Sequence, residues 1–230
     1  MERKEAIHSA YRLTGGNSFY DGMITCSTLS GKAVCRLVWD MNREESDAYL
    51  EKALSGIPDH FSGKLLEVPV GTGILTMPVY RTLPDADITC LDYSEDMMGQ
   101  AQEKANRLAL KNVTFQQGDV GALPYGTGTF DIVLSLNGFH AFPDKEAAYR
   151  EIFRVLKPGG TFCGCFYVEG EHKRTDWFVR HVYEKSGFFT PPYETAASLK
   201  NRLERMYADV TFGTEKGIAW FVCKGGRSEI

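Results

Sequence analysis

The chain has 230 residues, of which 43% are hydrophobic, 24% charged and 12% aromatic, with 26 Lys and Arg against 30 Asp and Glu. This composition is typical of a globular protein and excludes a disordered or fibrous chain. The formal net charge of -4 offers no basic field for a polyanion, so nucleic-acid binding is not expected and a small-molecule ligand is favoured.

Hydropathy and cysteine usage restrict the class of protein further. No uncharged run reaches the roughly 18 apolar residues that a membrane span requires. The first residues, Met-Glu-Arg-Lys-Glu, are not followed by the apolar stretch of a secretory signal. The six cysteines are scattered and contain no C-x-x-C pair. We therefore expect a cytoplasmic protein with reduced thiols.

Residues 1–60 do not share the pattern of the rest of the chain. Within them, Lys32–Leu54 can be written as one amphipathic helix. A separate domain is not expected, because 60 residues with so few apolar clusters would bury little surface alone. The sequence predicts an N-terminal helical flank or lid over residues 1–60, followed by one domain over residues 61–230.

From about Lys64 onward, short apolar runs alternate with amphipathic stretches, as in βα units that build a parallel sheet. The predicted strands are Leu65–Val68, Asp87–Leu91, Val113–Gln116, Phe130–Ser135 and Thr161–Val168, and the predicted helices are Ser94–Leu110, Asp144–Leu156, Asp176–Ser186 and Thr195–Met206. Two further strands, Tyr207–Gly213 and Ile218–Lys224, flank a turn and predict a terminal antiparallel hairpin. The expected fold is α/β and Rossmann-like, with seven strands, mostly parallel, and helices on both faces.

The first predicted strand continues into a glycine-containing turn and then into a helix. Gly71 and Gly73 supply two positions without side chains, where the backbone can approach a ligand closely. Asp92 ends the next strand, where its carboxylate can accept hydrogen bonds from ribose hydroxyls. The order of strand, turn, helix, strand and acid predicts a site for a nucleotide moiety.

Three features argue against a nicotinamide cofactor. Thr76 stands where the dinucleotide motif has its third glycine. Glu67 lies at the end of the first strand, where its charge would repel a pyrophosphate and attract an ammonium or sulfonium group. A final antiparallel strand is also unusual among dinucleotide-binding folds.

Several motifs resemble those of the class I S-adenosylmethionine-dependent methyltransferases, in particular the ubiquinone and menaquinone biosynthesis type of C-methyltransferase and its small-molecule relatives. The likeness covers about residues 60–224 and rests on Glu67–Gly73, Asp92, Gly118–Val120, Leu123–Leu134, Phe142–Asp144 and Leu156–Gly160. It implies a methyltransferase domain, S-adenosyl-L-methionine as cofactor and direct transfer of the methyl group to a small-molecule acceptor.

The resemblance also implies a role for individual residues. Asp92 is expected to bind the ribose, Asp119 the adenine amino group, and Tyr20 the methionine end of the cofactor. The full set of residues that it implies to bind the cofactor is Glu67, Pro69, Gly71, Gly73, Asp92, Tyr93, Met97, Asp119, Val120, Leu136 and Tyr20.

Pro69 departs from the family pattern, which has a glycine at this position. Proline removes one backbone N–H and fixes φ near -65°, so weaker cofactor binding is expected. His140, shortly after the fourth strand, is the candidate catalytic base, with a structural role as the alternative. No acid-rich cluster follows the fourth strand, so the expected reaction is independent of metal.

Two other functions stay open on the sequence alone. One is a non-catalytic module that binds S-adenosylmethionine, because the acceptor half of the site has no motif. The other is a nicotinamide-dependent reductase, against which Thr76 and Glu67 argue.

Overall fold

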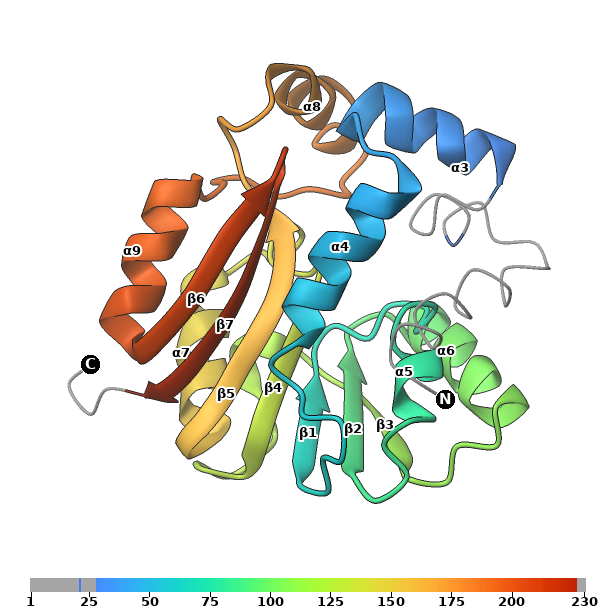
Figure 1. Cartoon of the computed structure of the whole chain (residues 1–230), viewed down its shortest axis with the longest axis vertical. Coiled ribbons are helices and arrows are strands. Elements are labelled where there is room, and N and C mark those ends of the chain that lie inside the picture. The colour runs from blue at the N-terminus through green and yellow to red at the C-terminus, as the bar shows by residue number, and fades with distance from the viewer. Residues whose placement is uncertain (1–20, 22–27, 227–230) are drawn as a thin grey trace.

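Seven strands form the central sheet of the computed structural model, which describes residue 21 and residues 28–226 (Figure 1). In chain order they are β1 (Lys64–Glu67), β2 (Asp87–Asp92), β3 (Val113–Gln117), β4 (Phe130–Leu136), β5 (Leu156–Tyr167), β6 (Tyr207–Glu215) and β7 (Ile218–Gly226). Their order across the sheet is β3-β2-β1-β4-β5-β7-β6. The strands β1 to β5 are parallel, and β7 lies antiparallel to both β5 and β6. The expected sheet and terminal hairpin are confirmed.

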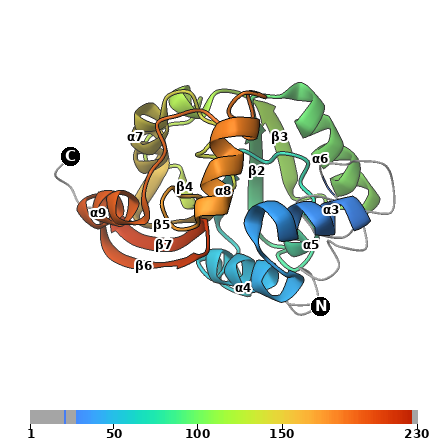
Figure 2. The same ribbon diagram turned by 90° about the horizontal axis from the view of Figure 1, so that it is seen from above.

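Helices cover both faces of the sheet, as Figure 2 shows from above. One face packs against α4 (Arg43–Leu54), α5 (Met77–Tyr80) and α6 (Glu95–Arg107), and the other against α7 (Lys145–Val155) and α9 (Ala196–Met206). Successive side chains of a strand point to opposite faces, so Leu65 joins the first apolar cluster and Leu66 the second. In the part of the chain that the structure describes, no helix is both long and apolar enough to cross a bilayer.

Polar side chains at the predicted helix starts form the expected caps. Ser94 accepts a hydrogen bond from the backbone N–H of Met97 at the start of α6, and Asp144 accepts one from Ala147 at the start of α7. Such caps satisfy backbone donors that have no partner inside the helix. They begin each helix directly after the loop that follows a strand, at the edge where the parallel strands end.

The N-terminal part of the chain differs from the single helix expected over Lys32–Leu54. A helix over α3 (Leu29–Val34) and η1 (Cys35–Trp39) ends at Asp40, whose φ is 53°. Asn42 then caps α4 and forms a capping box with Glu45, which starts a second helix. The buried Leu50 and Leu54 make α4 part of the core against the sheet.

Two further helical segments lie beyond β5, α8 (Lys173–Phe178) and η3 (Val179–Tyr183). Figure 1 shows α8 next to α3, above the ends of the parallel strands. Arg174 joins them, because its guanidinium donates to the Asp40 carboxylate at 2.6 Å and to the carbonyl of Arg36 at 2.9 Å. Two segments that are far apart in sequence therefore cover the same edge of the sheet.

The cysteines only partly follow the expectation of reduced thiols. Cys35 is disulfide-bonded, so the expectation is wrong at this residue. Cys90, Cys163, Cys165 and Cys223 are free and buried. Cys163 and Cys165 lie two residues apart on one face of β5, where they pack as small apolar side chains.

Candidate functional site

The turn after β1 needs its glycines. Gly71 has a φ of 55° and Gly73 a φ of 66°. Residues that carry a side chain rarely adopt this left-handed region. A Cβ at Gly73 would also lie 2.9 Å from Met77 and 3.0 Å from Ala101. The turn therefore brings backbone to the surface of a cavity at Gly71.

Pro69 is accommodated by Gly138, a glycine on the neighbouring loop. It lines the same cavity as Gly71 and packs against Gly138, which follows β4. A Cβ at Gly138 would overlap Cδ of Pro69 and would lie 2.9 Å from Phe142. The proline that departs from the family pattern is thus matched by missing side-chain volume on the neighbouring loop.

Glu67 differs from the charged group expected from the sequence. Its side chain is buried and accepts a hydrogen bond from the Tyr80 hydroxyl at 2.7 Å, with the Cys90 thiol at 3.6 Å. Burial raises the pKa of the Glu67 carboxyl to about 8, although the hydrogen bond from Tyr80 opposes this rise. The carboxyl is therefore mostly protonated at pH 7, and the expected charge on it is absent in this state.

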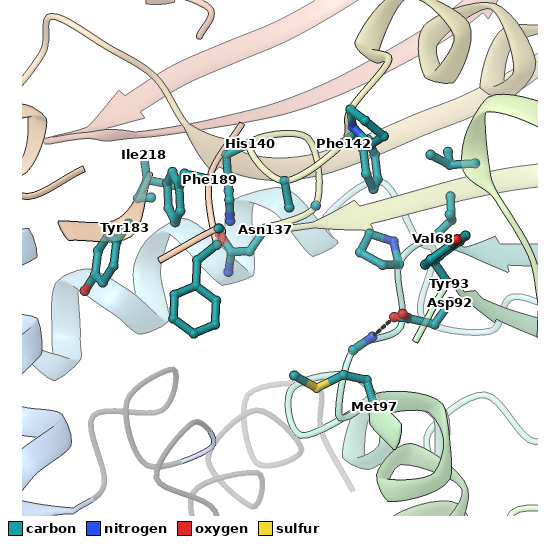
Figure 3. Close-up of a pocket in the computed structure, with 18 of the residues that line it drawn as sticks. Val68, Asp92, Tyr93, Met97, Asn137, His140, Phe142, Tyr183, Phe189 and Ile218 are labelled. Carbon is teal, nitrogen blue, oxygen red and sulfur yellow. Dashed lines mark hydrogen bonds between the residues drawn. The ribbon is translucent and has the colours of Figure 1, made fainter. Parts of the chain in front are cut away.

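Asp92 connects the turn after β1 to the end of β2. Its Oδ2 accepts a hydrogen bond from the backbone N–H of Gly71 at 2.7 Å, drawn in Figure 3, and its Oδ1 accepts one from Ser94 at 2.8 Å. Burial raises the pKa of Asp92, while these hydrogen bonds oppose the rise. Each carboxylate oxygen can accept a second hydrogen bond, so the side chain keeps acceptor capacity toward the cavity that it lines.

The remaining sequence-predicted residues lie around the same strand ends. Tyr93, Met97, Asp119 and Val120 line the cavity with Asp92. Tyr93 is 78% exposed, and Asp119 accepts a hydrogen bond from the backbone of Gly121 at 2.8 Å. Glu67, Gly73 and Leu136 line a smaller adjoining recess that also includes Pro69 and Gly71. Tyr20 lies outside the described residues.

A cavity of about 720 Å³ runs along this edge of the sheet. Figure 3 shows Val68, Asp92 and Met97 at one end, Tyr183, Phe189 and Ile218 at the other, and Asn137 and His140 between them. Its only charged lining residues in the described chain are Asp92 and Asp119, both at the first end. A volume of this size is typical of small-molecule sites.

His140 lies in the middle of the cavity as a neutral group. Its ring stacks on Phe189, with 3.9 Å between ring centroids, and its buried Nδ1 has no hydrogen-bond partner among the described atoms. Burial lowers the pKa of His140 to about 3, and the charge of Lys145 acts in the same direction. A neutral imidazole can accept or donate a hydrogen bond to a ligand, but it is a weak base for removing a proton at neutral pH.

Aromatic residues that the sequence gave no reason to group form the far end of the cavity. Successive rings of His140, Phe189, Tyr183 and Trp39 lie within 20° of parallel, and all four line the cavity. They come from three separate segments, so no local pattern joins them. The stack makes this end of the cavity aromatic and largely apolar, which suits an apolar aromatic acceptor.

A contact between the N-terminal segment and the glycine turn was also missed. Asp21 is buried, forms an ion pair with Lys104 of α6 at 2.9 Å and accepts a hydrogen bond from the Thr72 hydroxyl. In the sequence, the only signal for this contact is that Asp21 directly follows Tyr20. This contact ties a residue far upstream to the turn that lines the cavity.

No group of three or more His, Cys, Asp or Glu side chains placed to hold a metal ion was found among residues 21 and 28–226. The residues at the first end instead suit a nucleoside. They offer acceptor oxygens on Asp92 and Asp119, side-chain-free backbone at Gly71, and the apolar flanks of Val120 and Met97.

Comparison with known proteins identifies the central part of the chain. Residues 65–160 match the family model of a methyltransferase domain. Demethylmenaquinone methyltransferase of Lactococcus lactis is 36% identical over 118 residues, which make up 51% of this chain and 47% of that protein. The 2-methyl-6-phytyl-1,4-hydroquinone methyltransferase 1 of rice is 36% identical over 104 residues, or 45% of this chain and 31% of that protein. The chain therefore spans half or less of these curated relatives.

A solved structure agrees on the fold. The crystal structure of a SAM-dependent methyltransferase from Aquifex aeolicus superposes with a TM-score of 0.57 at 21% identity, covering 76% of this chain and 88% of that one. The resemblance carried by the sequence motifs is confirmed. Residues 65–160 are similar to a methyltransferase domain, and the chain has the fold seen in the solved S-adenosylmethionine-dependent methyltransferase.

Proposed function

We propose that this protein is a methyltransferase that uses S-adenosyl-L-methionine to methylate a small, uncharged, planar acceptor by direct displacement and without a metal. The observation that carries the proposal is the single cavity, which joins a nucleoside-compatible end at Asp92 to an aromatic end at Phe189. The relatives named above act on quinone-type molecules according to their names, which supports an acceptor of this kind.

At the cofactor end, Asp92 would accept hydrogen bonds from the ribose hydroxyls, and Gly71 would let the backbone lie close to the ligand. Asp119 would accept from the adenine amino group, while Val120 and Met97 would flank the base. When bound, S-adenosylmethionine supplies an electrophilic methyl group on a positively charged sulfur. Glu67 lines the recess that adjoins this end, so a positive charge bound there would favour the ionised form of its carboxyl.

At the acceptor end, the chain positions the nucleophile. His140 and Asn137 lie between the two ends, where the acceptor atom and the methyl group must meet. Holding two reactants in line supplies up to about 7 to 11 kcal/mol of the barrier reduction in favourable cases. A ring nitrogen of the neutral His140 hydrogen-bonds an acceptor hydroxyl and orients it.

The aromatic end favours an uncharged small molecule over other acceptors. Neither Lys nor Arg lines the cavity in the described residues, and the net charge of the chain is -4. A phosphate-bearing acceptor or a nucleic acid would find no compensating charge there. No Asp or Glu side chain among the described lining residues lies at the aromatic end, which disfavours a cationic amine as the acceptor.

Isothermal titration with S-adenosylmethionine, S-adenosylhomocysteine and NADH tests the cofactor. We expect micromolar binding of the first two ligands and none of NADH. Binding of NADH alone would favour a reductase. Absence of any binding would point to a degenerate site and to Pro69 as its cause.

Transfer of a labelled methyl group tests the acceptor. The panel comprises 1,4-naphthohydroquinone and methylhydroquinone, with phenethylamine and benzoate as charged counterparts. We expect turnover with a hydroquinone and none with the charged compounds. Cofactor binding without turnover on the panel would favour a module that binds S-adenosylmethionine without catalysis.

A further inference from the structure

One wall of the aromatic end depends on a segment that has no regular secondary structure. Residues 187–193 connect η3 to α9, and Phe189 in this segment is buried between His140 and Tyr183. Phe189 belongs to the apolar cluster on one face of the sheet, and the residue that follows it also contacts the loop after β4.

Thr190 makes the backbone part of these contacts. Its N–H donates to the carbonyl of His140 at 2.8 Å, and its hydroxyl donates to the carbonyl of Ala141 at 3.3 Å. Because Thr190 follows Phe189 directly, these two hydrogen bonds set the height of the Phe189 ring over the His140 ring. The remaining polar atom of the Thr190 backbone is its carbonyl oxygen.

Lys145 binds that carbonyl from the other side. Its Nζ donates to the carbonyl of Thr190 at 2.6 Å and to the carbonyl of Phe142 at 3.1 Å. The same ammonium lies 6.0 Å from the centre of the Tyr193 ring. One half-buried side chain therefore bridges the loop after β4 and the segment that carries Phe189.

The place of this lysine is unfavourable for helix stability. Lys145 is the first residue of α7, where the helix dipole disfavours a positive charge. Burial lowers the pKa of its ammonium group, although the charge of Glu194 opposes this change. Lys145 forms no ion pair among the described residues, so its charge is compensated by the two carbonyl contacts, the Tyr193 ring and the more distant carboxylate of Glu194.

We propose that Lys145 is a positioning residue for the methyl acceptor, because it ties Thr190 to Phe142 and thereby holds Phe189 against His140 before the acceptor binds. This inference rests on the proposed function, since it assumes that the aromatic end receives the acceptor. Lys145 does not line the cavity and touches no reacting atom.

Three variants test the proposal. Lys145→Met removes the donors and keeps the length of the side chain, Lys145→Arg keeps a charged donor, and Lys185→Met is the matched control. Lys185 is an exposed lysine just before the same segment and forms no ion pair or hydrogen bond among the described contacts. Hydrogen exchange of the peptide covering residues 187–193 is measured first, in the protein without ligands.

In Lys145→Met, we expect amide exchange in this peptide to rise about tenfold, while exchange in β4 and β5 stays unchanged. Loss of hydrogen bonds to a charged donor is expected to shift a local equilibrium by about this factor. The dissociation constant for S-adenosylmethionine should stay within about twofold of the unsubstituted protein. KM for the hydroquinone should rise about tenfold, with kcat changed less than threefold, and Lys145→Arg should restore most of the loss.

Unchanged exchange in Lys145→Met would overturn the proposal, whatever the activity. Increased exchange with unchanged KM would overturn it as well, because the bridge would then be structural only. A rise in the dissociation constant for S-adenosylmethionine equal to the rise in KM would show general loosening and would also count against it. Failure of the proposed function is visible separately, as absent turnover in the unsubstituted protein.

Discussion

Oδ2 of Asp92 lies 2.7 Å from the backbone nitrogen of Gly71, whose N–H donates to it. This hydrogen bond joins the end of β2 to the turn after β1 before any ligand is present. The carboxylate therefore has two roles in the proposed site. It fixes the turn, and it offers its remaining acceptor capacity to the ribose hydroxyls.

Replacing Asp92 by Ala should weaken binding of S-adenosylmethionine by about tenfold to more than a hundredfold. A hydrogen bond to a charged group contributes roughly 1.5 to 3 kcal/mol, and about 1.4 kcal/mol corresponds to a factor of ten. Isothermal titration measures the change, and circular dichroism checks that the variant is folded.

Asp87→Asn is the control for this experiment, because Asp87 begins the same strand at its opposite end and its side chain forms, among the described residues, only an exposed ion pair with Lys64 at 4.0 Å. Its dissociation constant should equal that of the unsubstituted protein. An unchanged constant in Asp92→Ala would remove Asp92 from the cofactor site.

The sheet and the grouping of Gly71 with Asp92 at one end of the cavity were predictable because their signals are local. Each strand is a short apolar run, and the order of glycine turn and acid brings Gly71 and Asp92 to neighbouring strand ends by the rule that parallel strands end at one edge. The break at Asp40 could also have been predicted, since Asn42 and Glu45 have the spacing of a capping box.

The aromatic end of the cavity could not be predicted in the same way. Trp39 comes from the N-terminal segment, His140 from the loop after β4, and Tyr183 and Phe189 from the region after β5. Only the completed topology brings these rings together, and each alone has the pattern of an ordinary buried aromatic. The protonation state of Glu67 was missed for a related reason, because burial by the surrounding core decides it.

Glu67 should make the stability of the protein fall as the pH rises. Its pKa is about 8 in the folded state and near 4.5 when unfolded, so between these values the folded state binds more protons than the unfolded state. The free energy of unfolding then falls by up to about 1.4 kcal/mol per pH unit in this range. Thermal or urea unfolding of Glu67→Gln at pH 5 to 8 should show a weaker decline than the unsubstituted protein.

Glu204→Gln serves as the control for the unfolding series, since Glu204 is an exposed carboxylate on α9 whose one ion pair within the described part of the chain is the surface pair with Lys200. Its curve should follow that of the unsubstituted protein at every pH. Parallel curves for Glu67→Gln and the unsubstituted protein would mean that Glu67 is ionised in the fold.

His140 should act by hydrogen bonding and not as a titrating base. Because its pKa is about 3, kcat/KM should show no step near pH 6.5 over the range 5.5 to 8.5. His140→Phe keeps an aromatic ring against Phe189 and removes both ring nitrogens, so kcat/KM should fall only about tenfold, as expected for one neutral hydrogen bond. His181→Phe, a change at an exposed histidine of η3, should leave the rate unchanged.

A loss of 10² to 10⁴ in His140→Phe, together with a titration near pH 6 to 7 in the unsubstituted protein, would identify His140 as a general base. The stacking geometry would then have to change when ligands bind. The pH profile of the unsubstituted protein is therefore measured before the variant is made.

Pro69 and Gly138 should show energetic coupling. Gly138→Ala places a Cβ where Pro69 packs, and such overpacking typically costs about 1 to 3 kcal/mol of unfolding free energy. Pro69→Gly alone should cost roughly 0.4 to 1 kcal/mol through the greater freedom of the unfolded chain. In the double variant, part of the overlap is relieved, so the combined loss should fall short of the sum by more than about 0.5 kcal/mol.

Urea unfolding of the four proteins in this cycle measures the coupling. A parallel cycle with Gly126→Ala supplies the control, because a Cβ there would meet only the Thr129 hydroxyl at an ordinary distance of 3.6 Å. Pro69→Gly and Gly126→Ala should be additive. Additivity in the Gly138 cycle as well would show that Gly138 does not accommodate Pro69.

Pro69→Gly should also bind S-adenosylmethionine more tightly than the unsubstituted protein, because the substitution restores a backbone N–H to the turn. Isothermal titration of the variant measures directly whether the proline weakens cofactor binding.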